Sequence, residues 1–215
     1  MKIDSAGLPF IAGALVPAAL LAGTKRYGWA TGFAALGAFF AYFFRDPERR
    51  IPIGEGLVVS PADGRVMIAG LSDGRWSPPG SWSQITIFLS PVDVHINRTP
   101  VEGRVTRIEY RPGKFLPAYK QDACENELNE IWIDRGGETV VVRQVVGVLA
   151  RRIVCRIVEG QTLERGERIG LMKFGSRMDV FLPVDSDILA QVGQQVVAGE
   201  TVLARLRARA AAYGH

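Results

Sequence analysis

Hydrophobic and polar residues follow two different patterns on either side of residue 50. Residues 7–23 (GLPFIAGALVPAALLAG) and 28–44 (GWATGFAALGAFFAYFF) contain no charged side chain, and only the short segment TKRY separates them. Each stretch is near the lower limit of about 17 residues at which a helix crosses the hydrocarbon core of a bilayer. The pattern therefore predicts a membrane-anchoring helical hairpin over residues 1–50.

Two other interpretations apply to the same apolar stretches. A secretory signal peptide is disfavoured, because the second stretch follows at once and no small-x-small cleavage site leads into a polar chain. A re-entrant or interfacial hairpin, which dips into the bilayer without crossing it, stays open because the turn between the stretches is so short.

Basic residues lie on the flanks of this hairpin and in its turn. The flanks carry Lys2, Arg45, Arg49 and Arg50, and the turn carries Lys25 and Arg26. The excess on the flanks favours both ends of the hairpin in the cytoplasm. Aromatic residues 42–44, next to the segment RDPERR, are typical of the membrane interface. We therefore expect a protein of the cell (inner) membrane, with its remaining chain on the cytoplasmic face.

After residue 50, short apolar runs alternate with turn residues. The runs are rich in Val and Ile, as in SQITIFL, GRVTRIEY and MDVFLP, and Asp-Gly and Gly-Gly pairs separate several of them. This pattern is typical of strands joined by hairpins. No long amphipathic helix is expected before the last few residues. Residues 51–215 are therefore predicted to form one mainly β domain, built as a barrel or a sandwich.

Two segments of this domain look alike. Residues 56–70 (GLVVSPADGRVMIAG) and 191–204 (QVGQQVVAGETVLA) both set a glycine-bearing turn between short Val-rich strands. Each resembles the half-motif, or hammerhead, of biotinyl- and lipoyl-type carrier domains, in which two such units form a flattened barrel. The expected fold class is therefore a barrel/sandwich-hybrid with hammerhead elements, preceded by the helical hairpin.

Composition narrows the classes of partner and site. The net charge of +4 fits an anionic membrane surface or nucleic acid, but no Lys/Arg-rich run with interleaved aromatic residues favours nucleic acid. The two cysteines lie outside any CxxC motif, which indicates a reducing compartment. The only histidines are His95 and His215, so we expect no metal site built from histidines, and no metal.

Three residue types that support nucleophilic chemistry lie in separate segments. Asp63 is in the turn SPADG, His95 is in SPVDVHINRTP, and Ser176 follows Gly175 in KFGSRMDVFLP. Taken singly, each has an ordinary interpretation as an Asx turn, a structural histidine or a Gly-Ser turn. Together they supply a hydroxyl nucleophile, a base, and a carboxylate that fixes the tautomer of the base.

This set predicts a reaction of the chain with itself. The hydroxyl of Ser176 attacks the carbonyl of Gly175, and an ester replaces the amide. β-Elimination from the ester then cuts the chain and leaves a dehydroalanine, which loses ammonia to become a pyruvoyl group.

Eight segments in order carry a resemblance to a known family. They are FFRDPERR, SPADG, FLSPVDVHINRTP, the Tyr-x-x-Gly-x-Phe stretch of residues 110–115, ENE, GVLARRIV, RGERIGLMKFGSRMDVFLP and VVAGETVLA. From about residue 43 to residue 206 the chain resembles the phosphatidylserine decarboxylase proenzymes, specifically their short membrane-associated prokaryotic branch. The resemblance implies cleavage between Gly175 and Ser176, into a β chain (1–175) and an α chain (176–215).

The resemblance also implies an activity. The pyruvoyl group derived from Ser176 would form a Schiff base with the headgroup amine of phosphatidylserine and support its decarboxylation to phosphatidylethanolamine. No metal and no dissociable cofactor would take part. The implied partners are the lipid substrate and the membrane, and close relatives indicate self-association into a homo-oligomer.

One motif departs from the pattern of the longer family members. Those members carry His-x-x-His, whereas this chain reads His95-Ile96-Asn97-Arg98. One histidine is therefore left for both self-cleavage and decarboxylation. The resemblance implies that Asp63 and His95 are elements of the catalytic base.

Three basic residues are candidates for binding the anionic groups of the substrate. They are Arg98, Lys173 and Arg177. Ordinary surface charge is the competing interpretation for each of them.

A carrier or adaptor is the competing interpretation of the whole chain. The segment LMKF resembles the hairpin lysine of biotinyl and lipoyl carriers, in which case Lys173 would bear the cofactor and the chain would stay uncut. A membrane-anchored adaptor of a transport assembly would carry no modification at all.

Overall fold

The computed structural model describes residues 2–74, 76–118, 125–147, 152–173 and 176–207. The chain separates into two compact units, Met1–Glu48 and Arg49–His215. Each unit is described below by itself.

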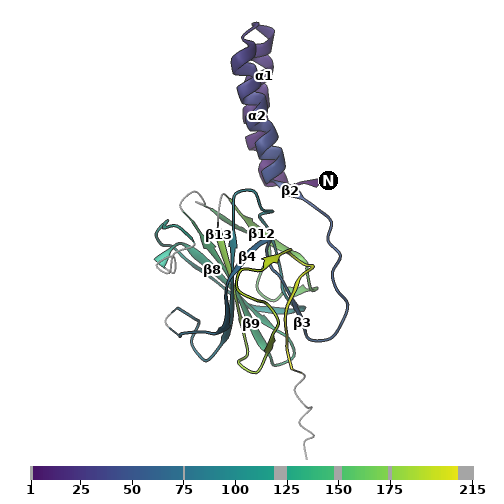
Figure 1. The fold of residues 1–215 in the computed structure, drawn as a ribbon, viewed down its shortest axis with the longest axis vertical. Coiled ribbons are helices and arrows are strands. Elements are labelled where there is room, and N and C mark those ends of the chain that lie inside the picture. Colours follow the sequence, from purple (N-terminus) through teal and green to yellow (C-terminus); the bar gives the residue numbers. More distant parts are fainter. Residues whose placement is uncertain (1, 75, 119–124, 148–151, 174–175, 208–215) are drawn as a thin grey trace, which may run out of the picture. The chain divides into compact units, whose positions relative to one another are not determined.

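The first unit is a helical hairpin. Helix α1 (Leu8–Gly23) and helix α2 (Tyr27–Phe43) lie side by side (Figure 1). The short 3-10 helix η1 (Ser5–Gly7) precedes α1, and strands β1 (Lys2–Ile3) and β2 (Arg45–Asp46) pair antiparallel at the open end. Within the described part of the chain, Ser5–Gly23 is the single helical segment that is long and apolar enough to cross a membrane.

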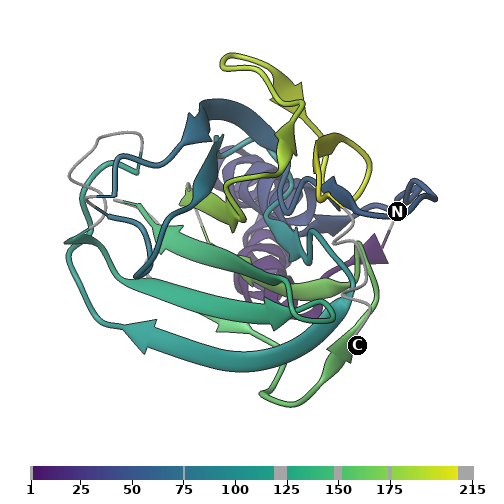
Figure 2. The same ribbon diagram turned by 90° about the horizontal axis from the view of Figure 1, so that it is seen from below.

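The second unit is built from strands, which confirms the mainly β fold. Its fourteen strands are β3 (Leu57–Val59), β4 (Gly64–Leu71), β5 (Ser83–Leu89), β6 (Ile96–Arg98), β7 (Gly103–Arg111), β8 (Leu128–Asp134), β9 (Thr139–Val146), β10 (Ile153–Cys155), β11 (Thr162–Leu163), β12 (Arg168–Met172), β13 (Ser176–Leu182), β14 (Asp187–Ile188), β15 (Gln195–Val196) and β16 (Val202–Arg205). Eight of them form one sheet in the order β11-β7-β8-β9-β13-β5-β4-β15, which curls into a half-barrel (Figure 2). Two three-stranded sheets, β10-β12-β6 and β14-β16-β3, complete the unit.

The two similar sequence segments are neighbours in space. Strand β16 pairs antiparallel with β3, and β15 pairs antiparallel with β4. Residues 56–70 and 191–204 therefore contribute strands to the same two ladders. Their assignment to carrier-type hammerheads stays a prediction.

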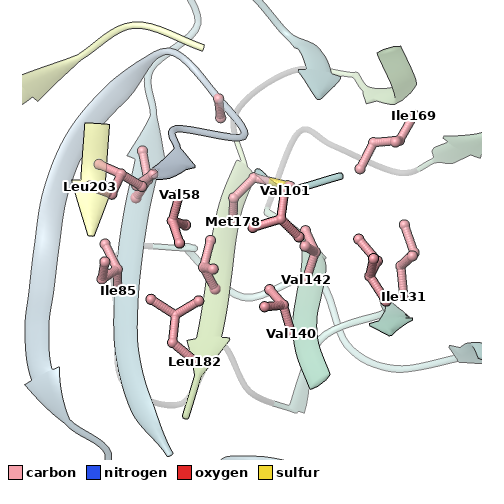
Figure 3. Close-up of a cluster of buried hydrophobic side chains, with 14 of the residues drawn as sticks. Val58, Ile85, Val101, Ile131, Val140, Val142, Ile169, Met178, Leu182 and Leu203 are labelled. Atoms are coloured by element: carbon pink, nitrogen blue, oxygen red, sulfur yellow. The ribbon is translucent and has the colours of Figure 1, made fainter. Parts of the chain in front are cut away.

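Every second side chain along the long strands points to the same face of the sheet, and the apolar side chains on the inner face build the core. In β13, Met178 and Leu182 point into the hydrophobic cluster that also holds Val140 and Val142 of β9 (Figure 3). Val180 of β13 belongs to the same cluster. All five side chains are fully buried, and each contributes roughly 1.5–3 kcal/mol relative to exposure. Strand β13 is hydrogen-bonded to β9 on one side and to β5 on the other, so it is an interior strand of the large sheet. The core therefore fixes the position of the residues that begin β13.

Candidate functional site

Ser176 is the first residue of β13. It lies opposite Leu89 of β5 and Val146 of β9. Its side chain is fully buried, and its Oγ makes no hydrogen bond to any of the described residues. A buried hydroxyl without a partner costs about 1–3 kcal/mol, so its retention calls for an explanation. Gly175, the other half of the predicted cleavage site, lies outside the residues that the structure describes.

His95 immediately precedes β6 and is almost completely buried. Its Nδ1 lies 2.9 Å from the carbonyl oxygen of Asp93. A carbonyl oxygen only accepts, so we assign the proton of the neutral ring to Nδ1, which makes Nε2 the atom able to take a proton. The Asp93 carboxylate in turn accepts from the main-chain N–H and the hydroxyl of Ser90, at 2.8 and 2.7 Å. The SPVD turn therefore orients the imidazole through a main-chain carbonyl.

Asp63 ends the SPADG turn and accepts hydrogen bonds from two directions. The Nη2 atom of Arg49 donates to both of its oxygens, at 2.9 and 2.8 Å, and the main-chain N–H of Ala198 donates to Oδ1 at 2.8 Å. From the sequence, Arg49 was grouped with the arginines of the membrane interface. It is instead the partner of a predicted site residue, and no short-range signal indicated this pairing across fourteen positions of the chain.

Strand register places Asp63 and Ser176 at the same end of β5. Arg65 of β4 lies opposite Phe88, and Ser176 lies opposite the next residue, Leu89. Asp63 comes two residues before Arg65, so it reaches this end of the sheet just before β4 begins.

Main-chain hydrogen bonds bring the segment around His95 to the same place. The N–H of Arg98 donates to the carbonyl of Pro61 in the SPADG turn, at 2.9 Å. The N–H of Met172 donates to the carbonyl of His95 at 3.3 Å, and Met172 is four residues before Ser176. Main-chain contacts and strand register thus link the three segments that carry Asp63, His95 and Ser176.

A chain of buried amides lies on the same face of the sheet as Ser176. Asn129 Nδ2 donates to Gln144 Oε1 at 3.0 Å, and Gln144 Nε2 donates to Asn97 Oδ1 at 2.9 Å. All three side chains are buried, and Asn97 and Gln144 are completely so. The sequence analysis missed these residues. The available signal was a polar residue at an inward position of a strand whose other inward residues are valines, as at Gln144 in TVVVRQVV.

The three basic candidates lie in different surroundings. The guanidinium of Arg98 donates through Nη1 to the carbonyl of Gly166 at 2.8 Å. Lys173 is half-buried and directly follows β12. Arg177 is adjacent to Ser176 on β13 and therefore points to the opposite face of the sheet, where its Nη2 donates to Asp179 at 3.0 Å.

No group of three or more His, Cys, Asp or Glu side chains within the described ranges is placed to hold a metal ion. The polar groups at this end of the sheet are instead a hydroxyl, an imidazole, an arginine-bound carboxylate and a chain of amides. Such a set can move protons and stabilise a negatively charged oxygen.

Comparisons with known proteins point to one family. The family model described as phosphatidylserine decarboxylase matches residues 36–204. The chain is 49% identical over 204 residues to the phosphatidylserine decarboxylase proenzyme of Symbiobacterium thermophilum, covering 93% of this chain and 94% of the relative. It is 45% identical to the protein of the same name from Chlorobium phaeobacteroides, over 82% and 83% of the two chains. For the Azorhizobium caulinodans proenzyme the identity is 45%, over 95% of this chain and 89% of the relative.

Proposed function

The chain belongs to the phosphatidylserine decarboxylase family, and from this premise we propose that it converts phosphatidylserine to phosphatidylethanolamine after cutting itself between Gly175 and Ser176. The observation that carries the proposal is the hydroxyl of Ser176, which is completely buried and unpaired within the described residues. The strand that leads toward it is linked to His95 by the main-chain hydrogen bond from Met172. A buried nucleophile beside a base suits an intramolecular reaction, because the attacked bond is part of the same chain.

The self-cleavage uses the groups of this site in a defined order. His95 takes the hydroxyl proton of Ser176 through Nε2, Oγ bonds to the Gly175 carbonyl carbon, and the C–N bond breaks as the nitrogen is protonated. Removal of the Cα proton of residue 176 then breaks the Cβ–Oγ bond and releases the carboxylate of Gly175. Hydrolysis of the resulting dehydroalanine releases ammonia. Asp63, paired with Arg49, would act on the imidazole through the electrostatic field of its carboxylate, because His95 Nδ1 faces the carbonyl of Asp93.

The residues present fit a pyruvoyl group at position 176. The side chain of Ser176 is completely buried, and its oxygen, unpaired within the described residues, is the atom that the reaction removes. When formed, the group supplies a ketone that binds the substrate amine and withdraws electrons during decarboxylation. His95 is the residue of this site that can hold and return a proton there.

The two fragments are expected to stay together after cleavage. Strand β13 would begin the α chain, yet it is hydrogen-bonded along its length to β5 and β9 of the β chain. Strand β16 similarly pairs with β3. Cutting one bond at the end of a strand leaves these ladders intact. Assembly of several copies stays a prediction.

Lys173, Arg98 and Arg177 are proposed to bind the substrate phosphate or carboxylate. Lys173 is half-buried, directly follows β12 and lies three residues before Ser176 in the sequence. Arg98 and Arg177 already donate to Gly166 and Asp179, so binding an anion requires them to share or exchange these acceptors.

The apolar segment Ser5–Gly23 supports attachment to the membrane in which the substrate resides. A lipid with two long acyl chains leaves a bilayer unfavourably, at about 0.8 kcal/mol per buried methylene, so an enzyme acting on it gains from being held at the surface. We propose the cell (inner) membrane, with the β domain on the cytoplasmic side, on the basis of the flanking lysines and arginines.

Intact mass of freshly purified full-length protein tests the proposal. The expected result is two fragments, residues 1–175 and 176–215, with the smaller fragment blocked to Edman degradation. Ser176→Ala should remain one chain and should leave phosphatidylserine unconverted in vesicles. Ser186→Ala is the matched control, because Ser186 is also a buried serine whose Oγ lacks a partner within the described residues. One uncut chain carrying an adduct on Lys173 would favour the carrier alternative, and one uncut and unmodified chain the adaptor.

A further inference from the structure

The chain of buried amides ends in a donor that has no assigned acceptor. Asn129 donates to Gln144, and Gln144 donates to the Oδ1 atom of Asn97. The side-chain oxygens of Gln144 and Asn97 therefore act as acceptors, and the hydrogen bonds run from Asn129 to Asn97. The remaining amide nitrogen, Asn97 Nδ2, is buried and makes no hydrogen bond to any described residue. The Asn97 side chain is completely buried, so bulk solvent does not reach this N–H group.

Strand register places this donor close to the predicted nucleophile. In the ladder between β13 and β9, Ser176 lies opposite Val146 and Met178 lies opposite Gln144. Ser176 and Gln144 therefore point to the same face as diagonal neighbours, whose Cα atoms are typically about 7–8 Å apart. Asn97 contacts Gln144 and is two residues from His95. An unpaired donor and an unpaired hydroxyl are thus buried on one side of the same sheet.

We propose that Asn97 Nδ2 donates a hydrogen bond to the carbonyl oxygen that becomes negatively charged when Ser176 attacks, which makes Asn97 a catalytic residue of self-cleavage. The inference rests on the proposed function. As the bond from Oγ to the carbonyl carbon forms, the electron pair of the C=O bond moves onto the oxygen, while the hydroxyl proton passes to His95. Collapse of this intermediate restores the C=O bond and breaks the C–N bond, and the proton is delivered to the departing nitrogen.

The surroundings of Asn97 suit this role better than a purely structural one. A structural amide in a core uses its donors as well as its acceptor, whereas this amide uses only Oδ1 within the described part of the chain. Gln144 and Asn129 hold it in place, so that the donor does not have to reorganise when charge develops. Removal of one such donor from an oxyanion site typically slows the reaction by about 10²–10³-fold.

Two substitutions of Asn97 test the proposal by their effect on cleavage. Asn97→Leu removes the donor, and Asn97→Asp keeps the size of the side chain and its acceptor while replacing the amide N–H group with a carboxylate oxygen. For both, we expect the 176–215 fragment to appear about 10²–10³-fold more slowly than in the unsubstituted protein. The melting temperature is measured alongside, and if Asn97→Leu fails to fold, Asn97→Asp decides.

Hydroxylamine separates a defect in the first step from a defect in a later one. Hydroxylamine cleaves esters and spares amides, so it cuts any chain in which Oγ has already displaced the nitrogen. We expect the Asn97 variants to stay uncut in hydroxylamine, as Ser176→Ala does, because the ester does not accumulate. Cleavage at the unsubstituted rate, or accumulation of an ester that hydroxylamine cuts, would overturn the role of Asn97. If the unsubstituted protein itself stays uncut and resists hydroxylamine, it is the proposed function that fails.

Discussion

Arg49 donates hydrogen bonds from Nη2 to both carboxylate oxygens of Asp63, at 2.9 and 2.8 Å. Both side chains are largely shielded, at 11% and 15% exposure. The remaining hydrogen bond to this carboxylate comes from the main-chain N–H of Ala198. The segment that directly follows the apolar hairpin in sequence thus holds a predicted site residue in place.

Replacing Arg49 should destabilise the second unit and slow self-cleavage. In Arg49→Met, the Asp63 carboxylate loses the cationic partner that it has within the described residues, which we expect to cost about 1–3 kcal/mol. Urea unfolding is best measured on a Ser176→Ala background, where cleavage does not complicate the transition. Arg50→Met is the control, because Arg50 is exposed and uses its main-chain N–H, which the substitution keeps, to contact Glu200. Equal stability of the two variants would show that the Arg49 pair contributes nothing.

The sequence indicated candidate residues for this site because their types are chemically distinctive. Short Val-rich runs between glycine-bearing turns correctly indicated a β domain, whereas the roles of Asp63, His95 and Ser176 as nucleophile and base elements stay predictions. Register could not be predicted in the same way, since it depends on which strands pair across the chain. The adjacent residues Ser176 and Arg177 lie on opposite faces of one buried strand, and both faces are covered.

The partners of these residues were less accessible to sequence reasoning. Asp63 is held by Arg49 and by the N–H of Ala198, 135 positions away along the chain. The Nδ1 atom of His95 lies 2.9 Å from a main-chain carbonyl oxygen, that of Asp93, which the residue types alone do not reveal. Asn97 and Gln144 look like ordinary polar residues until the packing of β6 against β9 brings them together.

A side chain at residue 64 should push the SPADG turn off strand β5. Gly64 has a φ of +149°, and a Cβ atom there would lie 2.2 Å from the carbonyl oxygen of Phe88. We expect Gly64→Ala to lose more than about 1 kcal/mol of stability and to slow cleavage, because Asp63 moves with the turn. Gly70→Ala is a matched control on the same strand, since Gly70 has a φ of +147° but nothing within 4 Å of the added Cβ. Both variants share the backbone strain, so any difference between them measures the clash. Indistinguishable melting and cleavage would contradict this account.

Removing the imidazole of His95 should block processing while leaving the fold intact. We expect His95→Asn to release the 176–215 fragment about 10²–10⁴-fold more slowly, which is the usual contribution of a general base. Mass spectrometry of protein sampled over time after synthesis gives the rate. Val92→Ala is the control in the same turn, because Val92 is 60% exposed. A His95→Asn chain that cuts as fast as the Val92→Ala chain would remove His95 from the mechanism.

Replacing Asp179 should lower the free energy of unfolding, because this residue belongs to a buried cluster of charges on the face of β13 opposite Ser176. Its Oδ1 accepts from the hydroxyl of Thr86 at 2.8 Å and its Oδ2 accepts from Arg177 at 3.0 Å, while Arg143 Nη1 lies 4.0 Å away. Asp179→Asn leaves the charge of Arg177, whose side chain is only 10% exposed, without its carboxylate. We expect a loss of about 3–5 kcal/mol in the free energy of unfolding.

Two further variants separate this structural effect from a role of Arg177 in binding substrate. Thr86→Val removes one hydrogen bond to the same carboxylate and should cost less than Asp179→Asn, about 1.5–3 kcal/mol. If Arg177 chiefly neutralises Asp179, the double variant Arg177→Met/Asp179→Asn should be more stable than Asp179→Asn alone, because no unpaired guanidinium is left. A double variant that is less stable than either single variant would show that the two charges do not compensate each other. If Arg177 also binds the lipid headgroup, the processed Arg177→Met enzyme should show a raised KM for phosphatidylserine at an unchanged cleavage rate.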